Sequence, residues 1–237
     1  MALVLRVDVD KPYGRTTLRD KILSKLREDY WFPAISSLGY LNYLRIFLDF
    51  LSEEEIKAHI YFRKCTLPPK RWLAGSLLNG HKLGLHAEDT RSFETFKKEL
   101  EEVQAHFNPK RLSSFTKHGS GKWKGGRHHY PLYEPDKYLK WAETIGISFL
   151  FGNAEKISEP EESSGQNQFY PGMFWIERYR SNECERFTLQ RVINIAKNKN
   201  VIVIIHPEHF IDIKRVENDM KKLVSLARQH NVSWITL

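Results

Sequence analysis

The apolar run Val201–Ile205 constrains the fold more than any other feature of this 237-residue sequence. It reads Val-Ile-Val-Ile-Ile, without the polar residues at alternate positions that a half-exposed strand would carry. Such a continuous β-branched run predicts a strand of a parallel sheet that is covered on both faces. Residues 3–9 predict a second strand of this kind at the N-terminus.

Strand and helix patterns alternate along the whole chain. We predict strands over 3–9, 59–62, 82–86, 112–116, 147–151, 173–176, 201–205 and 233–237. We predict helices over 17–27, 41–51, 68–78, 92–106, 135–144, 185–197 and 213–227. The clearest helix, 92–106, has an apolar stripe at spacings of three and four, formed by Phe93, Phe96, Leu100, Val103 and Phe107. The residues between 158 and 168 are polar and predict a loop.

This alternation predicts an α/β fold with a parallel sheet, either a (β/α) barrel or an open doubly wound sheet. No glycine-rich phosphate loop follows a predicted strand, which counts against a nucleotide-binding open sheet. We therefore expect a (β/α) barrel of seven or eight units that forms one domain over residues 1–237.

Composition excludes some functions and leaves others open. No stretch approaches the ~20 apolar residues of a membrane helix, and Cys65 and Cys184 are expected to be free thiols in a reducing compartment, so we expect a cytoplasmic protein. The formal net charge is +8, and basic residues gather between Lys110 and His129. This charge suits an acidic or phosphorylated ligand, but no recognised nucleic-acid-binding motif accompanies it, so nucleic acid is not expected as a partner.

Polar residues cluster where the predicted strands end. They are Asp8, Asp10, Arg63, Lys64, His86, Glu88, Asp89, Lys117, His118, Glu177, Arg178, His206, Glu208 and His209. In a (β/α) barrel the carboxyl ends of the strands meet at one mouth, where catalytic groups gather. The sequence therefore predicts one site built from distant positions.

Three strand ends carry the strongest chemical signals. Asp8 and Asp10 are two apart, so they share a face of the strand, where two carboxylates repel unless a cation or a proton lies between them. They could also cap the backbone of a turn. His86 leaves a buried strand into an acidic turn and suits a metal such as Zn²⁺. His206 ends the Val201–Ile205 run before Pro207 and suits a general acid, or it could cap the next helix.

In their order, these motifs resemble the polysaccharide deacetylases of the NodB-homology class, carbohydrate esterase family 4. The matching landmarks are Asp8-x-Asp10, the segment from Gly80 to His86, and an apolar run closed by His206, so the resemblance spans almost the whole chain. It implies a distorted (β/α) barrel that removes acyl groups from sugars. It also implies that Asp8 is the general base, Asp10 and His86 bind the metal, and His206 is the general acid.

The sequence departs from the family pattern at two points. The family's second metal-binding histidine would stand at position 90, where this chain has Thr90, a poor zinc ligand. Glu88, Asp89 or His118 could complete the metal shell, and we expect Glu88 to do so. The arginine-containing third motif has no recognisable counterpart either, which indicates a divergent branch of the family.

We therefore expect a metal-dependent deacetylase that acts on an acylated amino sugar or an anionic carbohydrate. The residues expected to contact this substrate are Arg63, Lys117, His118, Glu177 and His209. A catalytically inactive barrel that binds a glycan is the first alternative, and Thr90 favours it. A phosphate- or nucleic-acid-binding protein is the second alternative, and the net charge favours it. The sequence does not indicate the oligomeric state.

Overall fold

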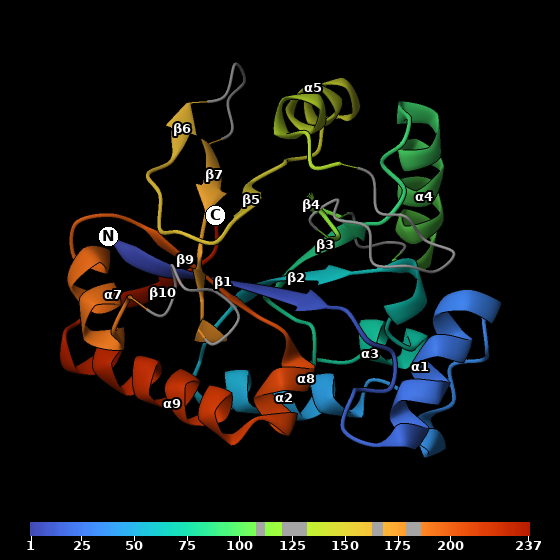
Figure 1. Cartoon of the computed structure of the whole chain (residues 1–237), viewed down its shortest axis with the longest axis horizontal. Helices are drawn as coiled ribbons and strands as arrows, with labels where there is room; N and C mark the ends of the chain where they lie inside the picture. The colour runs from blue at the N-terminus through green and yellow to red at the C-terminus, as the bar shows by residue number, and fades with distance from the viewer. Residues whose placement is uncertain (108–111, 120–131, 163–167, 179–185) are drawn as a thin grey trace.

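The main sheet of this protein is parallel throughout, as the apolar runs predict. The computed structural model describes residues 1–107, 112–119, 132–162, 168–178 and 186–237. The main sheet has seven strands in the order β4-β3-β2-β1-β9-β8, and β10 also pairs with β1 (Figure 1). These strands are β1 (Ala2–Val9), β2 (Ala58–Phe62), β3 (Lys82–Ala87), β4 (Ser114–Lys117), β8 (Phe174–Trp175), β9 (Val201–Ile205) and β10 (Ser233–Ile235).

The sheet curls beyond β4 toward a second, three-stranded sheet. Ser114 of β4 forms a parallel bridge with Ser148, shortly before β5 (Phe151–Ala154) begins. β5 pairs in parallel with β7 (Gln168–Gly172), and the short β6 (Glu161–Glu162) pairs with β7 in the antiparallel sense. The resulting curled parallel sheet is a half-barrel surrounded by helices, which confirms the expected fold class.

The helices follow the strands along the chain and cover the outside of the sheet. They are α1 (Leu18–Tyr30), α2 (Asn42–Glu53), α3 (Lys70–Ala74), α4 (Phe93–His106), α5 (Pro135–Ile145), α7 (Leu189–Ala196), α8 (Pro207–Asp212) and α9 (Lys214–Gln229). The 3-10 turns η1 (Ser36–Leu38) and η2 (Lys64–Thr66) complete the described connections. Helix α4 begins where predicted, because the Ser92 side chain accepts a hydrogen bond from the Thr95 backbone at 3.2 Å.

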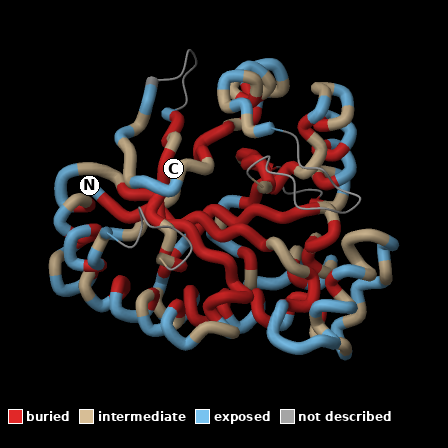
Figure 2. The backbone as a smooth tube through the Cα atoms, in the orientation of Figure 1, coloured by how far each residue is buried: buried red, intermediate tan, exposed pale blue. Residues whose placement is uncertain are grey.

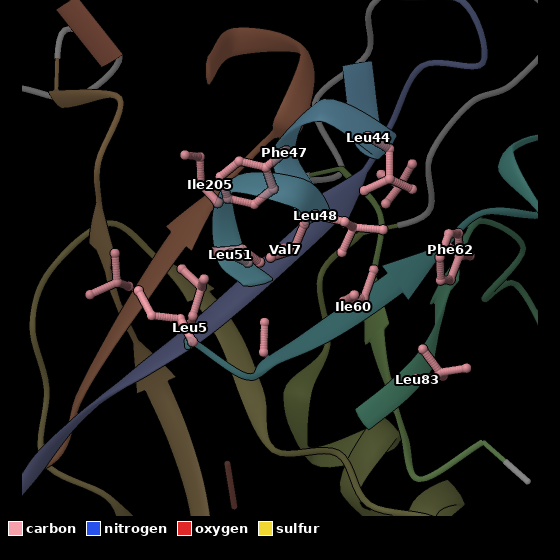
Figure 3. Packing of buried hydrophobic residues seen from close by; sticks show 14 of the residues in the cluster. Leu5, Val7, Leu44, Phe47, Leu48, Leu51, Ile60, Phe62, Leu83 and Ile205 are labelled. Carbon is pink, nitrogen blue, oxygen red and sulfur yellow. The ribbon is translucent and has the colours of Figure 1, made fainter. Parts of the chain in front are cut away.

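Alternate residues of the strands face two different apolar cores. Leu5 and Val7 of β1 pack outward against α2, where Figure 3 shows Phe47 and Leu48 lying over the strands. The alternate residues of β1 point into the half-barrel. One of them, Val4, packs there with Tyr61 and Ile204 in a second core. Both faces of the central strands are therefore buried, as Figure 2 shows for the middle of the sheet.

The structure differs from the sequence prediction at several elements. The predicted helix 185–197 begins only at Leu189, since residues 186–188 are not helical. The predicted strand 147–151 lies mostly before β5, which begins at Phe151. Within β5, position 152 requires a glycine, because a Cβ atom there would lie 2.3 Å from the Pro171 carbonyl oxygen. Part of the predicted loop 158–168 forms β6 and the start of β7. Helix α3 is shorter than predicted, and α8 was not predicted, because its short sequence has no full apolar stripe.

Candidate active site

The inward-facing strand positions bring the predicted site residues together. Asp8 lies on the same face of β1 as Arg6 and Val4, and His86 lies on the same face of β3 as Gly84. His206 follows β9 with the inward orientation of Ile204. The parallel strands end at the same edge of the sheet (Figure 1). These side chains meet there, and Asp10 lies among them.

Asp10 is the centre of this arrangement. Its Oδ1 atom lies 3.4 Å from Nε2 of His86 and 3.2 Å from Nδ1 of His118, and its Oδ2 atom lies 3.5 Å from Nε2 of His206. Burial raises the pKa of Asp10, but the neighbouring His118 and His206 outweigh burial and hold this pKa well below its usual range. Asp10 is therefore a carboxylate that faces three imidazoles.

Asp10, His86 and His118 have the geometry and chemistry of a metal site. Their candidate ligand atoms all lie within 4.8 Å of one another. Ligands at ~2.05 Å from a tetrahedral zinc ion are about 3.3 Å apart, close to the 3.4 and 3.2 Å distances from Asp10. Oδ1 of Asp10 is buried and accepts no hydrogen bond from a described residue. The set of one carboxylate and two imidazoles fits Zn²⁺ or another first-row ion.

His118 is neutral in the form that a metal requires. Burial lowers its pKa to about 4, although the Asp10 carboxylate acts in the opposite direction. It follows β4 with the inward orientation of Thr116, whose Oγ1 lies 2.7 Å from Nδ1 of His86 and shares a hydrogen bond with it. This contact orients the ring of His86 so that Nε2 faces Asp10.

Arg6 holds the Asp8 carboxylate in a buried, bidentate ion pair. Its Nε and Nη2 atoms donate to the two carboxylate oxygens at 2.9 and 2.7 Å, and Nη1 donates to the Gly152 carbonyl at 2.7 Å. Burial raises the pKa of Asp8, but Arg6 and then His86 outweigh burial and lower this pKa. Asp8 is therefore ionised, and its Oδ2 atom lies 3.5 Å from Nε2 of His86.

His206 is held from behind by a second buried carboxylate. Glu177 Oε1 accepts from the His206 backbone N–H at 2.9 Å and lies 2.9 Å from Nδ1 of the same residue. The same oxygen lies 2.9 Å from Nδ1 of His209. Burial alone would lower the pKa of His206, but Glu177 and Asp10 raise it to about 10. His206 is therefore protonated at neutral pH.

Three further predicted site residues lie around this centre. Arg63 donates to the Asp10 carbonyl oxygen at 2.6 Å and forms a charged contact with Glu88. Glu88 thus pairs with an arginine and does not belong to the cluster of Asp10, His86 and His118. Lys117 has the outward orientation of Phe115, and its Nζ donates to the His118 carbonyl at 2.5 Å.

Thr90 lies outside the cluster of candidate ligands. It is fully buried, and its hydroxyl oxygen lies 3.2 Å from the hydroxyl of Tyr138 in α5. The Thr90 hydroxyl therefore contacts α5, whereas His118 lies beside Asp10 and His86.

Sequence reasoning overlooked two buried polar residues of the site. Arg6 carries a recognisable signal, since it is the one basic residue in an apolar strand and shares a face with Asp8. Thr116 has no such signal, because threonine is common in strands. Of the basic stretch from Lys110 to His129, the structure describes residues 112–119; the rest, which includes His128 and His129, lies outside the described residues.

The fold is similar to that of known carbohydrate deacetylases. The chain is similar to the catalytic domain of a peptidoglycan N-acetylglucosamine deacetylase from Eubacterium rectale, with a TM-score of 0.51, 11% identity, and coverage of 99% of this chain and 87% of that one. The chain is also similar to a Streptococcus mutans CE4 esterase, with a TM-score of 0.51, 12% identity, and coverage of 100% of this chain and 85% of that one. A structure assigned to a glycoside hydrolase/deacetylase from Parabacteroides distasonis has a TM-score of 0.57 and 11% identity, with coverage of 99% of this chain and 69% of that one.

These likenesses establish the fold, which is the one the sequence motifs predicted. No protein-family model matches the chain, and a search of curated proteins gives no significant match. Within the described ranges, every helix is too short or too polar to cross a bilayer.

Proposed function

We propose that this protein is a metal-dependent hydrolase that removes an N-acetyl or similar acyl group from a sugar. The observation that carries the proposal is the Asp10 carboxylate, with two imidazoles beside one oxygen and a third imidazole beside the other. A bound divalent ion would polarise the acyl carbonyl. It would also lower the pKa of a bound water, so that this water can lose a proton and attack the carbonyl. The fold of deacetylases from other organisms supports this reaction class.

We assign the ligands of this ion to Asp10, His86 and His118. The third ligand is His118 and not Glu88, because Glu88 is engaged by Arg63, whereas Nδ1 of His118 faces Asp10. Zn²⁺ is the ion that suits one carboxylate and two imidazoles in a tetrahedral arrangement.

The remaining two residues divide the proton transfers between them. Asp8 is an ionised carboxylate, fixed in orientation by Arg6, and it accepts the proton of the attacking water. His206 is protonated, is held at Nδ1 by Glu177, and presents Nε2 to the Asp10 side of the site. His206 therefore donates the proton that the departing sugar amine requires.

A metal-binding titration tests whether His118 or Glu88 is the third ligand. Purified protein is stripped with a chelator and titrated with Zn²⁺, and the bound metal is counted by mass spectrometry. We expect about one ion per chain, and we expect His118→Ala to bind it about 100-fold more weakly. Glu88→Gln is the matched control and should bind as the parent does. Unchanged affinity in His118→Ala would overturn the ligand assignment.

Acetate release from N-acetylglucosamine oligomers then tests the reaction itself. Asp8→Asn and His206→Gln should retain the metal and lose most of the activity, since each removes one proton transfer worth ~10²–10⁴-fold. A zinc-loaded parent that releases no acetate from any acylated amino sugar would favour a barrel that only binds glycans.

A further inference from the structure

A basic pocket lies between helix α1 and the residues that follow β1. Its volume is about 220 Å³, and its lining includes Lys11, Arg15, Lys21 and Lys25, with Glu28 as the single carboxylate. Pockets that enclose a whole drug-sized ligand measure ~300–1,000 Å³, so this pocket has room for one small charged group. Four cations around one carboxylate form a site for an anion.

The charges of the pocket are only partly neutralised by the protein. Glu28 is shared, since its Oε1 lies 2.7 Å from Lys11 Nζ and 3.2 Å from Arg63 Nη1. Lys25, whose side chain is 60% exposed, pairs with Asp29 at 2.9 Å. Within the described ranges, neither Lys21 nor Arg15 forms an ion pair with a carboxylate. The pocket therefore keeps a positive excess.

Two contacts connect this pocket to the catalytic residues. Nη1 of Arg15 lies 3.1 Å from Nε2 of His209, whose Nδ1 faces Glu177 behind His206. On the other wall, Arg63 contacts both Glu28 and the backbone carbonyl of Asp10. The pocket is therefore linked to Asp10 through Arg63, and to His206 through His209 and Glu177.

We infer that this pocket is a phosphate subsite and that the substrate is a phosphorylated, N-acylated amino sugar. The inference rests on the proposed function, because it names the substrate class of the same site. Phosphate fits better than a carboxylate, because its oxygens can accept from one guanidinium and several ammonium groups together. The acyl group would then reach Asp10 while the phosphate stays among the lysines.

Binding of two sugars tests the subsite without any need for catalysis. The full chain is titrated with N-acetylglucosamine and with N-acetylglucosamine 1-phosphate by calorimetry at low salt. We expect the phosphorylated sugar to bind at least about tenfold more tightly, and we expect this preference to shrink as salt is added. Equal affinity for the two sugars would overturn the inference.

Paired lysine variants locate the effect on the molecule. Lys21→Gln/Lys25→Gln should reduce the preference for the phosphorylated sugar about tenfold, because it removes two of the four cations that line the pocket. Lys98→Gln/Lys222→Gln is the matched control, because it removes the same charge from exposed positions of α4 and α9. A preference reduced equally in both variants would show a general charge effect and refute the pocket.

The binding result and the deacetylation result fail independently. If zinc-loaded protein deacetylates both sugars with equal kcat/KM and binds them equally, the subsite is wrong and the proposed hydrolase stands. If it binds the phosphorylated sugar selectively but releases no acetate, the proposed hydrolase is wrong and the phosphate pocket stands.

Two sources of such a phosphate can be distinguished. Helix α1 also exposes Leu18 and Ile22, at 74% and 51%, beside the lysines of the pocket. The dodecyl phosphodiester of the same sugar therefore serves as a third probe. A loss of affinity for this probe alone in Leu18→Ser/Ile22→Ser would assign the phosphate to a lipid carrier. Equal binding of the soluble sugar phosphate and the diester in the variant and the parent would assign it to a soluble sugar phosphate.

Discussion

Arg6→Met should strongly destabilise the protein, although it leaves the apolar core intact. Among its buried hydrogen bonds, the guanidinium donates two to Asp8 and one to the Gly152 carbonyl. Its removal leaves a carboxylate that is only 3% exposed without its counter-ion. Breaking a buried pair in this way costs about 3–5 kcal/mol of the free energy of unfolding, which lowers Tm by about 10 °C in a chain of this size.

Urea unfolding followed by circular dichroism measures this loss, with Arg228→Met as the control. Arg228 pairs with Glu54 at 2.7 Å, but its side chain is 61% exposed, so its loss should cost less than about 1 kcal/mol. The double variant Arg6→Met/Asp8→Leu should be more stable than Arg6→Met, because it removes the stranded charge as well. A cost below about 1 kcal/mol for Arg6→Met, or a double variant less stable than the single one, would refute the reasoning.

Three further variants test the site's surroundings. Burial raises the pKa of Glu99 to about 7 from 4.5, so its contribution to stability is present below pH 4.5 and is lost as the pH rises to 7. The free energy of unfolding of the parent should therefore fall by about 3 kcal/mol between these pH values. Glu99→Gln should remove this decline, as measured by denaturation at each pH. Gly152→Ala would place a methyl group 2.3 Å from the Pro171 carbonyl oxygen and should lower the free energy of unfolding, measured in urea, by about 1–3 kcal/mol or more. Gly146→Ala is the control: its φ is 68°, but no atom lies close to the added methyl group, so its loss of stability should be smaller. Phe96→Ala should cost about 3–5 kcal/mol, because this fully buried ring stacks on Trp141 and contacts Phe115, and a cost near zero in thermal unfolding would contradict its place in the core.

The sequence predicted the centre of the site because the signals there are periodic. Asp8, Asp10 and His206 each end a buried strand, and the two-residue repeat of a strand determines which face a side chain occupies. The fold class followed from the same runs. The boundaries of β5 and α3 did not, because they depend on contacts such as that of Gly152 with Pro171, which no local pattern records.

The sequence alone did not show which of two side chains, Glu88 or His118, lies beside Asp10. Both follow the end of a strand by one residue, so spacing alone gives them similar access to the site. The difference comes from neighbours that are distant in sequence: Arg63 attracts the carboxylate of Glu88, while Nδ1 of His118 lies 3.2 Å from Asp10. A loop residue's partner is decided by tertiary structure, which a single sequence does not contain.

Although His118 lies one residue beyond β4, the hydrogen bonds between β3 and β4 continue to it, because its backbone N–H donates to the Ala87 carbonyl oxygen at 2.8 Å. β3 and β4 are paired in register, with Leu85 opposite Phe115 and His86 opposite Thr116. The same strand, β4, therefore leads directly to His118 and also supplies the Thr116 hydroxyl that orients His86. The rings of the two histidines pack edge to face at 4.8 Å. Candidate ligands held by one strand ladder need less help from a bound ion to keep their separation, and such preorganisation favours metal binding.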